Sequence, residues 1–308
     1  MVATTFVTLR HRLIKQGICL LFILIFVILG IALQGSISPS NIAFISSLFL
    51  FSTLEIFSCG ITKKQRLVSD FVDKPYAWEK RVWTNLVLVL LGGIVSVYLV
   101  LLANRAELNS WALFNIFNVP FAAVMLLSFL FLDLSHYTVH VLHHNVPALW
   151  RFHVVHHNDK VYDVTNAGRE HPFITATIKL AEVIVIILFG VPPLAYAIYA
   201  PAQIASSLFF HSNLKIPDAV DRKLRWLLVT PSLHYTHHSS IARDTDSVYG
   251  SILSIWDRFF GTYKNAPDMG IKRMEVGVDT FSNQNMGVLQ LLVLPFLNWS
   301  KLRRPHQG

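Results

Sequence analysis

The histidines of this chain are grouped in a way that predicts a metal site. All but two of the 14 histidines lie between residues 136 and 238. His-Val-Val-His-His at 153–157 and His-Tyr-Thr-His-His at 234–238 share one spacing, and His140 and His144 are four residues apart. Residues three and four apart share a helix face, so each set can direct two or three imidazoles at one point. Because neutral imidazole is the usual nitrogen ligand for iron, zinc, copper and nickel, these sets predict a metal centre.

The number of these histidines predicts two metal ions. One ion takes about four to six ligands, whereas the two triplets with His140 and His144 already supply eight. The chain has no Glu-x-x-His, which argues against a ferritin-like carboxylate bundle, and no His-Glu-x-x-His, which argues against a zinc metalloprotease. The donor type suits a redox metal that handles dioxygen, but it also allows zinc hydrolysis.

Composition indicates that a membrane surrounds this site. The chain is 53% hydrophobic and 14% charged, whereas a soluble domain has about a quarter charged residues. The net charge is +8, and the basic residues lie beside hydrophobic runs. We therefore expect them to set the orientation of the chain in the membrane and to contact anionic headgroups, and we expect no nucleic-acid partner. Cys19 and Cys59 lie in or at the end of hydrophobic runs and support neither a disulfide framework nor a thiolate site.

Four hydrophobic runs predict transmembrane helices, each near the roughly 20 residues that cross a bilayer. They cover about residues 17–34, 42–58, 83–103 and 119–133. The basic N-terminus and the basic loop between the second and third runs should face the cytoplasm, so the fourth run returns there. A single helix over 119–144 would be about 39 Å long, against a hydrocarbon core of about 30 Å. His140 and His144 should therefore emerge just past the cytoplasmic boundary.

A fifth apolar stretch, residues 174–210, predicts a helical hairpin that enters and leaves on one side. It is interrupted by Pro192-Pro193 and by Pro201. The arm over 183–191 is too short to span alone, and the sequence leaves open whether the hairpin is re-entrant or crosses fully. The polar remainder predicts a cytoplasmic cap, with a short apolar run at 288–296 that packs on it or lies at the interface.

The predicted fold is therefore an all-α integral membrane protein with about four transmembrane helices, a hydrophobic hairpin and a cytoplasmic, histidine-rich helical cap. We divide it into N-terminal transmembrane helices (1–117), a histidine-box catalytic domain (118–270) that contains the hairpin, and a C-terminal cytoplasmic segment (271–308).

Residues 133–264 resemble the fatty acid hydroxylase and sterol desaturase superfamily, which are membrane histidine-box di-iron oxygenases. The resemblance covers a little under half of the chain. It departs from the family at Val141, where arginine is common, and at Val248, where asparagine is common. The matching motifs, in the family's order, are Asp133 with His140-x3-His144, Trp150-Arg-Phe-His153-x2-His156-His157, Arg169-Glu-His171-Pro172, Phe210-His211-Ser-Asn213, Thr230-Pro-Ser-Leu-His234-x2-His237-His238, Tyr249-Gly250 and Trp256-x4-Gly261-Thr262.

The resemblance implies a di-iron centre and its ligands. Asp133 would accept a hydrogen bond from a ligand N–H, with Asn213 in a similar supporting role. His136 and His143 fall outside the family pattern and are predicted not to bind metal, whereas Trp150 is assigned to packing. Trp256 and Asp257 are expected to hold the cap together. The implied ligands are His140, His144, His153, His156, His157, His171, His211, His234, His237 and His238.

The resemblance also implies the reaction. Two iron ions would use dioxygen as co-substrate to hydroxylate or desaturate a C–H bond of a lipid, such as a sterol or fatty acyl chain. Electrons would come from a separate donor of the cytochrome b5 or ferredoxin type with its reductase. The expected location is a bacterial inner membrane or the endoplasmic reticulum, with the active site facing the cytoplasm.

Two other functions stay open at this point. A zinc-dependent hydrolase could use the same ligands. A membrane metal-binding or transport protein should carry ionisable residues along its spans, and the four predicted spans carry almost none apart from Glu55.

Overall fold

The computed structural model describes residues 80–93, 110–271, 273–278 and 286–297. Within these residues the regular structure is helical, apart from two isolated β-bridges, Leu228–Leu253 and Ser239–Val276. Residues 80–93 form a helix at the start of the third predicted span. The first two predicted spans, nearly all of the basic loop that follows them and the second half of the third span lie outside the described residues.

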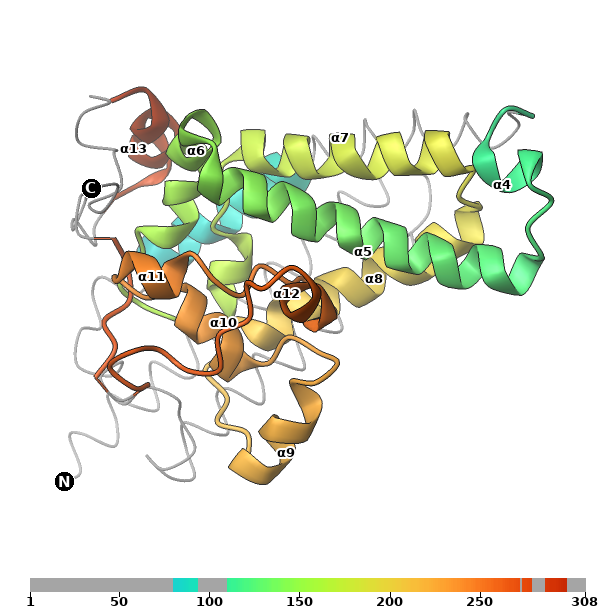
Figure 1. Cartoon of the computed structure of the whole chain (residues 1–308). Coiled ribbons are helices and arrows are strands. Elements are labelled where there is room, and N and C mark those ends of the chain that lie inside the picture. The colour runs from blue at the N-terminus through green and yellow to red at the C-terminus, as the bar shows by residue number, and fades with distance from the viewer. Residues whose placement is uncertain (1–79, 94–109, 272, 279–285, 298–308) are drawn as a thin grey trace, which may run out of the picture.

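Three long helices run side by side and extend to one end of the molecule (Figure 1). They are α5 (Phe121–Asn145), α7 (Pro172–Phe189) and α8 (Pro193–Phe210), and α5 packs along both of the others. α5 begins after Pro120 and its 25 residues are about 37 Å long. The prediction that the fourth hydrophobic run continues as one helix into the histidines is therefore confirmed. α5 and α7 are both long and apolar enough to cross a membrane.

The chain reverses direction between α7 and α8, where the sequence predicts a break. Gly190 ends α7 in the left-handed conformation, with φ of 75°. A Cβ on this residue would lie 2.7 Å from the Cβ of Ala112, so only glycine fits here. Pro193 then opens α8, where its fixed φ suits the first helical turn. Because α7 already begins at Pro172, it is twice as long as the arm that appeared too short to span, and its 18 residues measure about 27 Å.

Aromatic and aliphatic side chains fill the space between the long helices. The rings of Phe131 and Phe189 stack with centroids 4.3 Å apart, and Leu132 and Tyr199 are fully buried. α4 (Leu113–Ile116) covers the end of this core through Phe114, beside the α7–α8 turn. Apolar side chains also point outward, including Leu126, Leu180, Ile184 and Ile198. Long helices with apolar outer faces are suited to contact with lipid chains.

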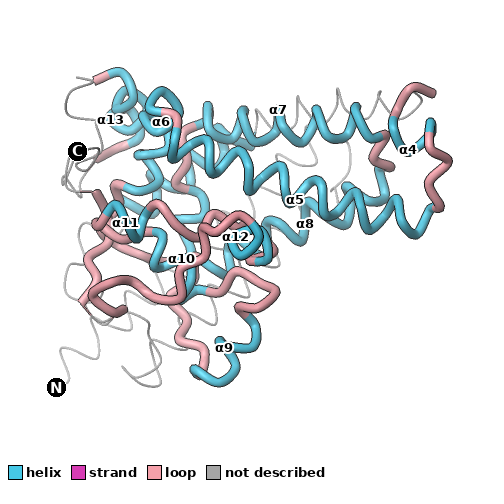
Figure 2. Tube along the Cα trace, in the orientation of Figure 1, coloured by secondary structure: helices cyan, strands magenta, loops and turns pink. Residues whose placement is uncertain are grey.

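Short helices and loops form a cap at the opposite end of the molecule (Figure 2). Of the two alternatives for the apolar run 288–296, the structure shows packing on the cap, because Leu291 and Leu294 belong to one buried cluster with Trp150 and Val154. The cap elements are α6 (Pro147–His157), η3 (Val164–Gly168), α9 (Asp218–Leu224), α10 (Pro231–His237), α11 (Ala242–Thr245), α12 (Ile255–Phe259), α13 (Val288–Val293) and η5 (Leu294–Phe296).

A buried charged network fastens the helix at 80–93 to the cap. The guanidinium of Arg81 binds the carboxylates of Asp159, at 2.8 Å, and Asp163, and it donates to Asn166 at 2.9 Å. All four side chains are nearly inaccessible to water. Because an unpaired buried charge is costly, this network fixes where the helix meets the cap.

Candidate metal centre

Of the ten histidines that the sequence predicts as ligands, the structure brings nine together where α5 meets the cap. His140 and His144 lie in the last two turns of α5. α6 begins at Pro147, directly after α5 ends, so the chain turns back and places its own histidines beside those of α5. α10 has seven residues and begins at Pro231. Proline suits the start of both short helices because the first turn has no acceptor for its N–H.

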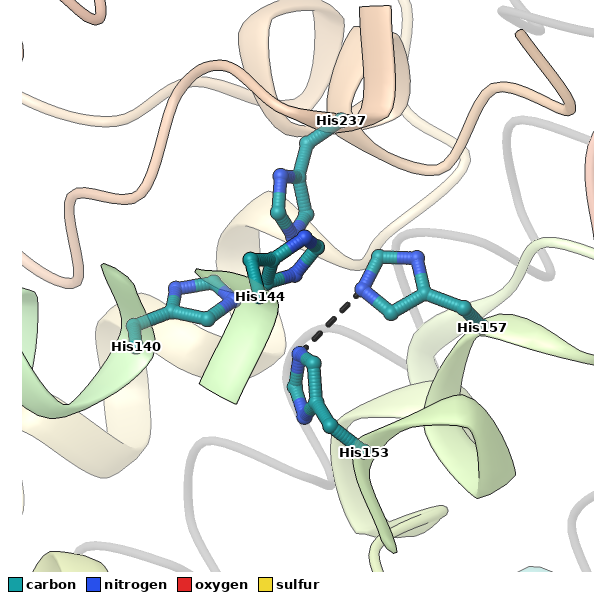
Figure 3. A group of neighbouring side chains, drawn as sticks. All are labelled: His140, His144, His153, His157 and His237. Atoms are coloured by element: carbon teal, nitrogen blue, oxygen red, sulfur yellow. Dashed lines mark hydrogen bonds between the residues drawn. The ribbon is translucent and has the colours of Figure 1, made fainter. Parts of the chain in front are cut away.

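Five imidazoles form the first group. His140 and His144 come from α5, His153 and His157 from α6, and His237 from α10, and one ring nitrogen of each lies within 4.8 Å of the others. Figure 3 shows that all five rings surround one point. Among the residues that the structure describes, no carboxylate or thiolate belongs to this group, so its donor set is entirely nitrogen.

Four imidazoles form the second group. It combines His156 from α6, His211 at the end of α8, and His234 and His238 from α10, again with one nitrogen of each within 4.8 Å of the others. All four side chains are buried. Groups of five and four nitrogens each match the coordination number of one transition-metal ion.

The two His-x-x-His-His triplets each serve both groups. On α6, His153 and His157 join the first group while His156 joins the second. On α10, His234 and His238 join the second group while His237 joins the first. Of the two or three imidazoles that each set was expected to direct at one point, two do so. Each pair at i,i+4 stays together, and the histidine at i+3 crosses to the neighbouring group.

Distances between nitrogens test whether a metal fits. The Nε2 atom of His211 lies 3.2 Å from that of His156 and 3.0 Å from that of His234, which in turn lies 3.1 Å from that of His238. A neutral ring nitrogen carries either one proton or one lone pair, so it makes one good hydrogen bond and cannot serve two neighbours. Two nitrogens on one ion at about 2.1 Å and at right angles lie about 3.0 Å apart. The residues therefore fit a shared metal ion.

Oxygen atoms on the far side of several rings fix which nitrogen faces the metal. The Nδ1 atoms of His140, His211 and His237 lie 2.9, 2.8 and 2.7 Å from the backbone oxygens of Tyr249, Ser207 and Ser247. Nδ1–H donates in each case, so the lone pair is on Nε2. The Nε2 atoms of His140 and His237 are buried without a hydrogen-bond partner, as expected for ligand atoms.

The loop that supplies two of these oxygens has an unusual backbone. Val248 lies between Ser247 and Tyr249 and has φ of 54°. A β-branched residue seldom adopts positive φ, whereas asparagine tolerates it better.

Burial keeps the imidazoles in the form that binds metal. Loss of hydration lowers the pKa of His153, His156 and His157 well below the usual 6.5, and neighbouring histidines lower it further. The same cause lowers the pKa of His211 to about 3. Because protonated imidazole cannot bind a metal ion, a dry site of this kind is ready for binding near neutral pH.

His171 lies outside both groups. Its Nδ1 accepts a hydrogen bond from the backbone N–H of Phe173 at 3.1 Å, which caps the start of α7, and its Nε2 lies 3.3 Å from the backbone oxygen of Leu292. The structure therefore assigns His171 to the junction of α7 and α13. His136 and His143 also lie outside both groups, and the Nε2 of His143 contacts the hydroxyl of Thr177 at 2.8 Å.

Asp133 does not contact a ligand histidine as predicted. Its carboxylate accepts hydrogen bonds from the backbone N–H groups of Ile252 and Leu253, at 3.0 and 3.1 Å, and from the indole of Trp256 at 2.8 Å. It therefore ties α5 to the cap loop that carries Tyr249. Asn213 is buried two residues after His211.

The sequence analysis missed the carboxylate of Asp246, whose Oδ1 lies 3.4 Å from the Nδ1 of His144. No spacing rule links this residue to the histidines. The roles of the backbone oxygens of Ser207, Ser247 and Tyr249 could not be predicted from residue type, because every residue has such an oxygen. Tyr249-Gly250 is nevertheless one of the matching motifs.

A cavity of about 150 Å³ adjoins both histidine groups. Besides metal-facing histidines, its lining includes the polar side chains of His136, Glu170, Lys179 and Gln203. Burial raises the pKa of Glu170 to about 7, although Lys179 and a hydrogen bond with Thr175 oppose this effect.

Comparison with known proteins matches residues 125–262 to a family described as fatty acid hydroxylase. Ornithine lipid hydroxylase OlsE of Rhizobium tropici is 33% identical over 158 residues, which cover 49% of this chain and 46% of that protein. Alkylglycerol monooxygenase of Danio rerio is 28% identical over 220 residues, 69% of this chain and 47% of that protein. A cholesterol 25-hydroxylase-like protein of Danio rerio is 30% identical over 138 residues, 43% of this chain and 52% of that protein. The chain thus spans about half the length of these relatives. No solved structure matches it.

Proposed function

Through residues 125–262 the chain belongs to the fatty acid hydroxylase family, and from this premise we propose that it is a membrane di-iron monooxygenase that hydroxylates a lipid. The observation that carries the proposal is the division of nine buried imidazoles into groups of five and four. The nine histidines of these groups are the proposed ligands, and His171 is left out because its two ring nitrogens contact other atoms.

The metal pair and the protein have separate tasks in this proposal. When bound, two iron ions supply the dioxygen chemistry that can oxidise an unactivated C–H bond, which no side chain can do. The chain's own residues hold the ions, keep the imidazoles neutral and exclude water. The backbone oxygens of Ser207, Ser247 and Tyr249 orient three of the rings.

We propose hydroxylation as the outcome, not desaturation. The names of the three relatives above all describe hydroxylases or monooxygenases. The lipid itself differs among those names.

The proposed arrangement in the membrane follows the charge pattern. α5 and the α7–α8 pair would enter the bilayer from the cytoplasmic side, with the two N-terminal spans and the helix that starts at residue 80 completing the membrane domain. The histidine groups would then lie at the cytoplasmic boundary. A soluble or membrane-anchored electron donor of the cytochrome b5 or ferredoxin type could approach the cap from this side.

Isotope labelling of lipids tests the proposal. Cells that express the chain are grown under ¹⁸O₂, and their lipids are compared by mass spectrometry with those of cells that express His237→Ala. We expect one lipid to gain a single ¹⁸O atom with the wild type and not with the variant. A product whose oxygen comes from water, formed equally well without dioxygen, would support the zinc hydrolase and refute the monooxygenase.

A further inference from the structure

We propose that an exposed aromatic and basic surface of the cap inserts into the headgroup region of an anionic membrane, on the side where the histidine groups lie. This α9–α12 surface is formed by the residues that follow α9 and by α12, and its apolar members are Trp226, Leu227, Phe259 and Phe260. The inference rests on the membrane arrangement in the proposed function and adds to it a second, peripheral contact with lipid.

The apolar side chains of this surface are exposed far beyond what is usual for their type. Phe259 is 80% exposed, Trp226 67%, Leu227 55% and Phe260 52%. The rings of Phe259 and Phe260 lie edge to face, with centroids 4.9 Å apart. Single exposed apolar residues are ordinary, whereas a group of large ones marks a surface that contacts a partner or a membrane.

Contacts between the two segments make the surface continuous. The guanidinium of Arg258, on α12, lies over the ring of Trp226 at 4.3 Å from its centroid, and it donates to the backbone oxygen of Arg225 at 3.0 Å. The backbone N–H of Ser254 donates to the backbone oxygen of Leu227 at 2.9 Å. The two segments therefore present their exposed side chains together.

The position of α12 along α5 sets the depth of this surface. The ring of Phe260 stacks on Tyr137 of α5 with centroids 5.3 Å apart, and the indole of Trp256 donates to Asp133 at 2.8 Å. Tyr137 and Asp133 precede His140 by three and seven residues, which is about 5 and 10 Å along the helix. With the histidines at the cytoplasmic boundary, α12 lies about 5–10 Å nearer the bilayer centre, the depth at which interfacial segments bury their apolar faces.

This position favours lipid over a protein as the partner. Figure 1 shows α12 beside α5, whereas α11 lies beyond the histidine end of that helix. A soluble electron donor approaches from the water and meets the α11 end of the cap first. Lipid headgroups, by contrast, already surround a membrane helix at the level of Tyr137, so they contact the neighbouring α12 without any further approach.

The charges beside the surface favour anionic headgroups. Within residues 215–227 three basic side chains are exposed, Lys215, Arg222 and Lys223, against one acidic side chain, Asp218. A basic residue near an anionic surface strengthens the contact about fivefold. Aromatic rings are enriched at the headgroup level of membranes, so both parts of the surface suit the same environment.

Depth-dependent fluorescence quenching tests the inference. The full chain with Cys19→Ser and Cys59→Ser receives one new cysteine, Phe259→Cys or Trp226→Cys, is labelled with nitrobenzoxadiazole and is placed in nanodiscs of phosphatidylcholine and phosphatidylglycerol. We expect blue-shifted emission, quenching by headgroup-nitroxide lipid and loss of quenching by aqueous iodide. The matched control is Arg243→Cys on α11, whose side chain is 84% exposed. Its label should be quenched by iodide and not by the nitroxide lipid.

A second comparison tests the choice of anionic lipid. Arg222→Gln with Lys223→Gln, introduced into the chain labelled at position 259, should weaken nitroxide quenching in nanodiscs that contain phosphatidylglycerol. The same double substitution should have no effect in nanodiscs of phosphatidylcholine alone, because there is no surface charge to lose. Circular dichroism of each labelled chain confirms that it is folded.

Two outcomes overturn the inference. If iodide quenches the labels at 226 and 259 as strongly as the control label, the surface faces water and suits a soluble protein partner instead. If the double substitution changes nothing in anionic nanodiscs, the basic residues do not bind headgroups. Alkaline carbonate extraction separates these results from failure of the proposed function: a chain that carbonate releases from membranes is not integral, and the proposed arrangement itself fails, whereas a retained chain with water-exposed labels loses only this inference.

Discussion

Replacing Asp133 should weaken the junction between α5 and the cap, and its effect can be worked out from the three hydrogen bonds that its carboxylate accepts. Asp133→Ala leaves two backbone N–H groups, of Ile252 and Leu253, and the indole N–H of Trp256 without acceptors. Asp133, Ile252 and Leu253 are all buried, so little water can replace the carboxylate. The segment from Tyr249 to Leu253, whose first residue orients His140, would lose its attachment to α5.

The expected magnitude follows from the cost of unsatisfied donors. Each buried donor without an acceptor costs about 1–3 kcal/mol. Local rearrangement recovers part of the sum for three donors, so we expect Asp133→Ala to lower the free energy of unfolding by about 4 kcal/mol. Asp133→Asn keeps one accepting oxygen and should cost about 2 kcal/mol. For a chain of this size the alanine variant should lose about 6 °C in Tm.

Differential scanning fluorimetry of the iron-loaded protein in detergent measures this effect. Thr138→Ala serves as the control, because Thr138 lies on the same helix, is exposed and bonds only to the backbone of its own turn. Its Tm should stay within about 2 °C of wild type. If Asp133→Ala melts as late as the control, the carboxylate does not hold the cap to α5 and the reasoning is refuted.

Three more predictions concern metal content, a buried charge and pH. His237→Ala removes a histidine from the group of five and should reduce bound iron below two ions per chain. His171→Ala, outside both groups, should retain two iron ions per chain. Elemental analysis of the purified variants distinguishes these results. Arg81→Met leaves the buried carboxylate of Asp163 without its cation and Asp159 with only Arg169, 3.7 Å away, so it should destabilise the protein by about 3 kcal/mol, measured as a lower Tm than that of the exposed-site variant Arg273→Met. The metal-free protein should lose stability as pH falls below about 6.5, because the unfolded chain then protonates histidines that the folded state holds neutral with lowered pKa; a Tm that is constant between pH 7 and 5 would contradict this sign.

The sequence predicts the type of centre well because the information is local. Spacings of three and four residues fix which histidines share a helix face, and these spacings lie within the short helices α6 and α10. The same argument could not assign His156 and His237 to the opposite group from their neighbours. That assignment depends on how α6 and α10 face each other, which spacing within one helix does not determine.

Contacts between distant segments explain the other differences. His171 follows the family motif, but the chain places it at the start of α7, beside the backbone of α13. Asp133 lies two turns before His140, yet its partners are some 120 residues later in the chain. The break at Pro192-Pro193 was visible in the sequence. The full length of α7 was not, because the charged residues Lys179 and Glu182 interrupt its apolar run. In the structure the two side chains form an ion pair, so each compensates the charge of the other inside the helix.

The way each triplet is shared also ties the spacing between the two histidine groups to two short helices. Long helices such as α5, α7 and α8 can change their tilt when the membrane becomes thicker or thinner. The step from one group to the other is made within a single turn of α6, between His153 and His156, and again within a single turn of α10, between His234 and His237. A helical turn has a fixed rise of about 5.4 Å. α6 and α10 therefore hold the two histidine groups at one separation, whereas a change in the tilt of α5 or α8 would move His140, His144 and His211 relative to them.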